Sequence, residues 1–254
     1  MKIRALIVNT FKEASRNKVF YLLIFIGVFF ALGSQITSLL TVGDKTKVLK
    51  DTGLAAIHFF SVLLTIFTGI NLIFKEIDKK TIYNILSKPI SRARFILGKF
   101  LGLSVTILTA LGAMVLIFSL FLYGSTGEFD SRLLIFYLLL YCELLILIAL
   151  SLFFSSFATP ISSSIFTISI FFVGHILWSF NLFKHKIQDP LFKTVLYGIY
   201  YVLPNLEKFN LKNEVVNELP IPPVLVFSSL GYGIFYVLSI LVLTILIFHK
   251  KEFK

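Results

Sequence analysis

The sequence is poor in charge. Asp, Glu, Lys and Arg make up only 15% of its 254 residues, whereas 57% are hydrophobic. The core of a soluble domain does not need so much apolar sequence. The composition therefore predicts an integral membrane protein.

Cysteine is almost absent. The single cysteine, Cys142, falls inside an apolar run, which excludes a disulfide framework and a cluster of thiolate metal ligands. The four histidines are scattered without the spacing of metal ligands. We therefore expect no metal site and no cofactor within this chain.

The sequence also lacks the short motifs of common catalytic sites. It has no GxxxxGK[ST] motif, so this chain is not expected to bind phosphate in such a loop or to hydrolyse ATP alone. It has neither HExxH nor GxSxG, and its ionisable residues do not form a set of nucleophile and base. We expect no catalytic residues and no enzymatic activity in this chain.

What the sequence does have is long apolar runs. At about 1.5 Å per residue, each run is long enough to cross roughly 30 Å of hydrocarbon as a helix. We therefore predict an all-α membrane protein, with one domain over residues 1–254, and an even number of spans places both termini on one face. The six predicted spans are 19–40, 53–74, 100–123, 133–154, 161–183 and 224–248.

The net charge of +11 could suggest a nucleic-acid partner, but its distribution argues against one. In the six-span topology, nearly all of the excess positive charge falls on the face that holds the termini. An excess of Lys and Arg marks the cytoplasmic side of a membrane, and anionic lipid headgroups favour it there. We therefore expect cytoplasmic termini, membrane lipid as a partner and no nucleic acid.

Two further segments carry apolar residues without spanning the membrane. Residues 2–17 predict an amphipathic helix that lies in the headgroup region. In the external segment 184–223, residues 191–203 are apolar and aromatic but too short to cross, so they predict an interfacial helix. The run that begins at residue 19 could be a signal peptide, but apolar sequence continues past Gly33, which favours a retained span.

Small residues recur at every fourth position of the third span, at Gly98, Gly102, Thr106 and Ala110. This spacing predicts a face where helix backbones approach closely, either within the chain or between two copies. The residues 229–233, SLGYG, invite comparison with a potassium filter, but they open directly into an apolar helix, which argues against that interpretation.

The connector 75–99, between the second and third spans, holds the densest basic charge. Apolar residues at helical spacing in 76–87 predict a short amphipathic helix. Pro89 would end that helix, and Ser91 is placed to cap the next one. The connector could instead be a solvated loop whose basic residues only set the topology.

The connector resembles the first cytoplasmic loop of ABC-2 type transporter permeases. The resemblance rests on Glu76 and Thr81, on LSKPISR at 86–92 and on LGKFLG at 97–102, although Lys80 stands where many members have Gly. A second stretch, LPNLEKFN at 203–210, is similar to a segment before the last span in the short six-span subgroup, which includes the permease of nitrous oxide reductase maturation.

The resemblance implies the membrane subunit of an ATP-binding cassette exporter in the inner (plasma) membrane of a prokaryote. It implies a second permease copy, identical or paralogous, and a separate ATPase subunit that binds ATP and Mg²⁺. In such permeases the loop acts as a coupling helix that seats on the ATPase. The residues expected to couple are Glu76, Thr81, Leu86, Lys88, Pro89 and Arg92.

Glu143 lies midway along the fourth span. An ionised carboxylate there would cost at least a few kcal/mol, so it should be protonated, paired or facing water. It is either a contact in a transport pathway or a carboxylic acid that hydrogen-bonds a neighbouring helix. His58 and His175 are further pathway candidates, and either could partner Glu143 if packing allows. Alternative functions are therefore a secondary, proton-linked transporter that uses Glu143 and a histidine, or a membrane scaffold that transports nothing.

Overall fold

The computed structural model describes residues 3–78, 91–183 and 189–250, and these form a helical bundle. Within these residues, six helices are long and apolar enough to cross a membrane, which confirms the predicted fold class. They are α2 (Lys18–Leu39), α3 (Lys45–Asp78), α5 (Arg92–Thr126), α6 (Arg132–Ser155), α7 (Pro160–Phe183) and α10 (Pro223–Lys250). The shorter elements are α1 (Ile3–Ser15), α8 (Pro190–Val202), the 3₁₀ helix η1 (Leu206–Phe209) and α9 (Lys212–Val216).

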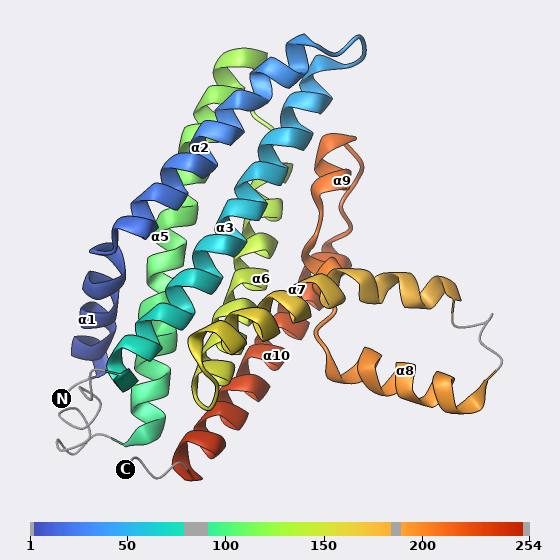
Figure 1. Ribbon diagram of the computed structural model, residues 1–254. Coiled ribbons are helices and arrows are strands. Elements are labelled where there is room, and N and C mark those ends of the chain that lie inside the picture. The colour runs from blue at the N-terminus through green and yellow to red at the C-terminus, as the bar shows by residue number, and fades with distance from the viewer. Residues whose placement is uncertain (1–2, 79–90, 184–188, 251–254) are drawn as a thin grey trace.

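Helix α6 forms the centre of the bundle. It packs against α3, α5, α7 and α10, and its side chains at Leu139, Leu144, Leu147 and Leu152 are fully buried. A helix that is apolar all round suits such a position. Helix α1 and the C-terminal end of α10 lie at the same end of the bundle, as an even number of spans requires (Figure 1).

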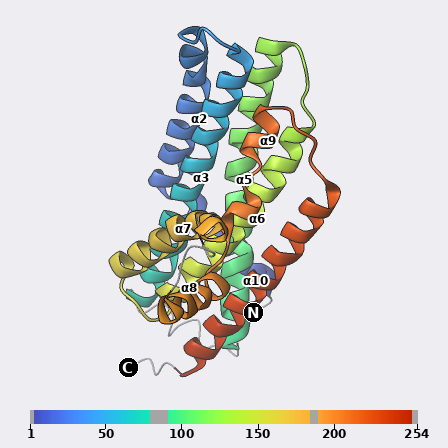
Figure 2. The ribbon, with the colours of Figure 1, turned by 90° about the vertical axis from the view of Figure 1, so that its right-hand side faces the viewer.

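Helices α7 and α8 extend to one side of the bundle and run in opposite directions (Figure 1). The helix predicted at 191–203 is present as α8, between Pro190 and Val202. Its placement at the membrane surface stays a prediction. Figure 2, seen from that side, shows α9 beside the ends of α3 and α6.

Most of the six long helices extend further than the predicted spans, and α3 and α5 do so into the predicted connector. Helix α3 continues to Asp78, and α5 begins at Arg92. The segment 75–99 predicted as a connector between spans therefore contains the end of α3 and the first turns of α5. Lys, Glu and Arg are good helix formers, so their charge marks where the hydrocarbon ends and not where the helix ends. Residues 79–90, which hold most of the predicted coupling helix, lie outside the described residues.

The start of α5 follows the predicted capping. Ser91 is the N-cap, and its hydroxyl accepts a hydrogen bond from the backbone N–H of Arg94 at 3.3 Å. This bond satisfies one of the backbone donors that a helix leaves unpaired in its first turn.

The stripe of small residues on α5 is a packing face within the chain. Gly98 and Gly102 are buried against α1, where a Cβ at either position would collide with Leu6 or Thr10. The missing side chains let α1 lie directly on α5. Of the two alternatives left open by the sequence, contact within the chain is thus confirmed for these glycines. The predicted location of α1 in the headgroup region stays a prediction.

The segment before the last span folds back onto the bundle. Leu206, Phe209 and Val215 are buried, and η1 packs against α6 and α7. Helix α10 holds this segment in place, because the Tyr232 hydroxyl accepts a hydrogen bond from the backbone N–H of Asn205 at 2.9 Å. Residues 229–233 are helical within α10, so they do not form the extended backbone of a filter.

Candidate functional site: a histidine and glutamate cluster inside the bundle

The sequence singled out three ionisable residues in the spans, and the fold brings them together. Glu143 lies on α6 and is only 1% exposed. His58 on α3 and His175 on α7 lie next to it with their ring centroids 5.7 Å apart, and both imidazoles are largely buried. We refer to these three residues, together with Glu207, as the intramembrane cluster.

Both histidines contact the same oxygen of Glu143. Its Oε1 lies 3.1 Å from Nε2 of His58 and 3.1 Å from Nε2 of His175. The sequence left three states open for this carboxyl, namely protonated, paired or facing water, and the structure gives it two imidazole partners. The partners come from α3 and α7, so the carboxyl joins helices that are far apart in the sequence.

The cluster continues from His175 to Glu207 in η1. Nδ1 of His175 lies 2.9 Å from Oε2 of Glu207. The side-chain amide of Asn210 donates a hydrogen bond to Oε1 of the same carboxyl at 3.0 Å. A continuous line of polar contacts thus runs from α3 through α6 and α7 to the segment before the last span.

This arrangement constrains the protons in the cluster. A neutral imidazole has one N–H, yet His175 faces a carboxyl oxygen with each of its ring nitrogens. Either His175 is the imidazolium and donates to both carboxylates, or Glu143 or Glu207 is a carboxylic acid. A nitrogen lone pair that faced a buried carboxylate oxygen would be repelled by it. A proton or another cation is therefore required between His175 and the two carboxyl groups.

Gly174 makes the contact between His175 and Glu207 sterically possible. A Cβ at Gly174 would lie 2.7 Å from the carbonyl oxygen of Pro204 and 2.8 Å from Cγ of Leu206. The absence of a side chain lets the segment 204–207 approach α7, and this approach brings Glu207 to the imidazole of the next residue. The ring of Phe171, one turn earlier on α7, packs edge-on against both histidines.

Glu207 and Asn210 were not predicted as site residues. The signal was present, because both lie in the stretch 203–210 that carries the second family resemblance. Glu207 also marks the border of the buried site, since it lines a pocket of about 510 Å³ together with Trp178 and Asn210. The cluster is therefore buried at Glu143 and open to this pocket at Glu207.

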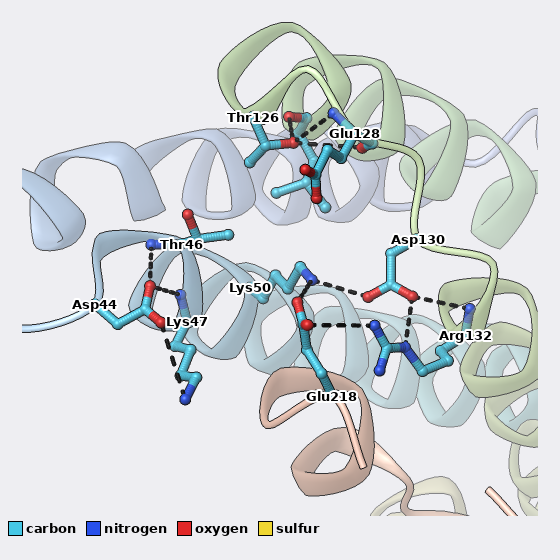
Figure 3. Close-up of polar contacts among 10 residues, drawn as sticks. Asp44, Thr46, Lys47, Lys50, Thr126, Glu128, Asp130, Arg132 and Glu218 are labelled. Atoms are coloured by element: carbon cyan, nitrogen blue, oxygen red, sulfur yellow. Dashed lines mark hydrogen bonds and ion pairs between the residues drawn. The ribbon is translucent and has the colours of Figure 1, made fainter. Parts of the chain in front are cut away.

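A second polar cluster joins loops at the end of the bundle away from α1 and the end of α10 (Figure 3). We call it the charged cluster, and it consists of Lys50, Asp130, Arg132 and Glu218. Nζ of Lys50 lies 2.8 Å from Oδ2 of Asp130 and 3.3 Å from Oε1 of Glu218. Arg132 contacts the same two carboxylates at 2.8 and 3.6 Å.

The charges of this second cluster balance. Burial alone would raise the pKa of Asp130, but hydrogen bonds from Arg132 and Lys50 outweigh it and hold the pKa below the ordinary value. Glu218 has a φ of 58°, in the left-handed region, and it directly follows Asn217, the C-cap of α9, where such a residue commonly ends a helix. Its side chain makes two ion pairs. The charged cluster ties α3, the α5–α6 loop and the end of α9 together.

Of the six predicted coupling residues, Arg92 is described with its contacts. Its Nη1 donates hydrogen bonds to the carbonyl oxygens of Phe248 and His249, at 2.7 and 2.8 Å. A cation here satisfies carbonyls that the end of α10 leaves unpaired, and it complements the helix dipole. Glu76 lies in the last turn of α3. The remaining four, Thr81, Leu86, Lys88 and Pro89, lie outside the described residues.

The fold and the cluster together define a multi-pass α-helical membrane protein whose spans enclose paired ionisable groups. The family model for the ABC-2 family transporter protein matches residues 5–253, and the chain belongs to this family. None of the curated proteins matches the chain.

Proposed function

We propose that this chain is the membrane-spanning permease subunit of an ATP-binding cassette exporter, driven by a separate ATPase subunit. The observation that carries the proposal is the family match over nearly the whole chain, because permeases of the ABC-2 family typically work with such a subunit. ATP and Mg²⁺ are then bound by the partner. A second permease copy, identical or paralogous, completes the transporter.

The connector between α3 and α5 is the proposed contact with the ATPase. Arg92 supports this role, because it is bonded to the end of α10 while it belongs to the first turn of α5. A displacement of the connector would therefore act on three spans at once, namely α3, α5 and α10. Glu76, Thr81, Leu86, Lys88 and Pro89 are proposed to contact the ATPase.

In this proposal both termini and the connector face the cytoplasm, and the protein lies in the inner membrane of a prokaryote. The excess of basic residues near these segments supports the orientation. Large apolar side chains on the outer faces of α2 and α7, such as Phe25, Phe29 and Ile176, are exposed in the single chain. They would contact lipid or the second copy.

The test is to express the chain with its cognate ATPase and to scramble residues 76–92. Stimulated ATP hydrolysis should be abolished, while membrane insertion remains intact. The control is a scramble of the α2–α3 turn at 41–44, which lies at the other end of the bundle and should leave hydrolysis unchanged. Hydrolysis that survives the first scramble would contradict coupling through the connector.

A second candidate function is favoured by the intramembrane cluster itself. Hydrogen-bonded contacts from His58 through Glu143 and His175 to Glu207 could pass a proton, as a secondary transporter requires. This alternative predicts transport without any ATPase, and it predicts loss of transport in Glu143→Gln. Transport that stops when the ATPase is inactivated would argue against it.

A further inference from the structure

We infer that His58, Glu143 and His175 form a binding site for a divalent first-row transition-metal ion of the Zn²⁺ type, with Glu207 orienting His175. This departs from the expectation, drawn from sequence spacing, that the chain has no metal site. It goes beyond the proposed function and does not depend on an ATPase.

The donor atoms are already gathered. One ligand atom from each of His58, Glu143 and His175 lies within 4.8 Å of the other two. In a tetrahedral site with metal–nitrogen distances of about 2.0 to 2.1 Å, neighbouring ligand atoms are about 3.3 Å apart. The Glu143 oxygen lies 3.1 Å from each Nε2, close to this value. The ligand atoms all lie within 4.8 Å of one another, so the two imidazoles would have to move together by at most about 1.5 Å to complete the geometry.

Glu207 stands where a metal-binding histidine has its supporting partner. A histidine ligand typically donates its other N–H to a carboxylate, and this fixes the tautomer and directs the free lone pair at the metal. The 2.9 Å contact between Nδ1 of His175 and Oε2 of Glu207 has this form, and Asn210 in turn holds Glu207. With a metal at Nε2, His175 keeps one proton and both of its nitrogens are satisfied.

Burial distinguishes this group from a chance cluster of surface acids. Glu143 is 1% exposed and lies in the span of α6, where an ionised carboxylate without a cation is costly. A bound divalent cation would offset that cost. The three ligands come from α3, α6 and α7, so the ion would also join three spans.

The donor set selects the class of ion. Two imidazoles and one carboxylate suit Zn²⁺ and its first-row neighbours, whereas Mg²⁺ and Ca²⁺ prefer oxygen ligands, and Cu⁺ prefers sulfur. Cys142, the next residue to Glu143, packs towards Gly233 on α10 and is not in the group. Three protein ligands leave a fourth position open, as in a site that exchanges its ion or binds a further molecule.

The test uses the purified full-length chain in detergent, without ATPase, and Co²⁺ as a spectroscopic probe. We expect one tightly bound Co²⁺ per chain, with the ligand-field absorption bands of a tetrahedral site, displaced by Zn²⁺ and not by Mg²⁺. The matched control is the H185A/H249A variant, which removes the two histidines outside the cluster and should keep the Co²⁺ absorption bands. H58A/H175A should lose them, and Glu207→Gln should weaken binding by about 10- to 100-fold.

Two outcomes would overturn the inference. One is Co²⁺ binding in H58A/H175A that equals that of the parent chain, which would place the metal elsewhere. The other is the absence of any bound metal in the H185A/H249A variant. If H58A/H175A does not fold, X-ray absorption at the zinc edge of the H185A/H249A protein decides the matter, because two imidazoles and an oxygen ligand are expected. Neither outcome affects the ATPase experiment above, so the two proposals fail separately.

Discussion

Each of the two polar clusters described above joins distant segments around one buried carboxylate, Asp130 or Glu143, but the cationic partners differ. In the charged cluster, Asp130 and Glu218 meet a lysine and an arginine, whose side chains have hydrogen-bond donors and no acceptor. In the intramembrane cluster, Glu143 and Glu207 meet imidazoles, whose charge depends on a proton or a metal. The first cluster is therefore suited to holding loops together. The second is suited to binding or exchanging a cation.

The largest effect on stability should come from breaking the charged cluster. Lys50→Met leaves both carboxylates to Arg132 alone, and removal of one partner of a buried ion pair costs about 3 to 5 kcal/mol. We expect the lower end of that range, measured as a lower Tm of the chain in detergent. The control is Lys47→Met on the same helix, because Lys47 is exposed and lies 3.9 Å from Asp44. It should change stability by about 0.5 kcal/mol or less.

Gly174→Ala should have the next largest effect, since the added methyl group meets the backbone of Pro204. Overpacking of this kind costs about 1 to 3 kcal/mol, and here it should also move Glu207 away from His175. The measurement is Tm together with Co²⁺ affinity. Gly112→Ala is the control, because nothing lies within 4 Å of that position on α5. An unchanged Co²⁺ affinity in Gly174→Ala would argue against the positioning role.

Glu143→Gln should separate binding from stability. The amide keeps the shape of the side chain and can still hydrogen-bond an imidazole, so we expect a change in stability of only about 1 kcal/mol. Co²⁺ binding, by contrast, should be lost with the charge. If Glu143→Gln lowered the stability of the chain as much as Lys50→Met does, the two clusters would contribute equally to stability, and the contrast between them would be wrong.

The smallest effect should be the pH dependence of the charged cluster. The pKa of Asp130 is lower in the folded chain than its ordinary value of 3.8, so its contribution to stability is present above that value. The contribution is lost as the pH falls below 3.8 and through the folded pKa. Comparison of Tm against pH for the parent chain and Asp130→Asn should show a smaller acid loss in the variant. Identical curves would mean that other carboxyl groups dominate.

Much of the fold could be predicted because apolar length and charge distribution are local properties. The six spans and the Ser91 cap follow from such signals. Helix ends did not, because α3 continues through charged residues beyond the apolar run. The partner of the Gly98 and Gly102 face also depended on the fold, since α1 and α5 are separated by two spans.

The candidate site was predicted in its parts but not in its assembly. Glu143 drew attention because a carboxyl inside an apolar run is costly, and the two histidines because they are ionisable and lie in spans. Their pairing joins positions 85 and 32 residues apart, and no local pattern specifies such contacts. Glu207 was missed because it lies outside the spans, where an acidic residue is unremarkable until Gly174 lets its segment reach His175.

The hydrogen bonds of Arg92 have a practical consequence for work on this protein. They place Phe248, near the end of α10, beside Arg92 in the first turn of α5, although the two residues are 156 positions apart in sequence. A truncation after Phe248 would remove the carbonyl of His249, and an affinity tag at this end would lie close to Arg92. Either change would affect the proposed contact with the ATPase. The position of the tag should therefore be held constant when ATPase activities are compared. A tag inserted in the α2–α3 turn would lie at the opposite end of the bundle.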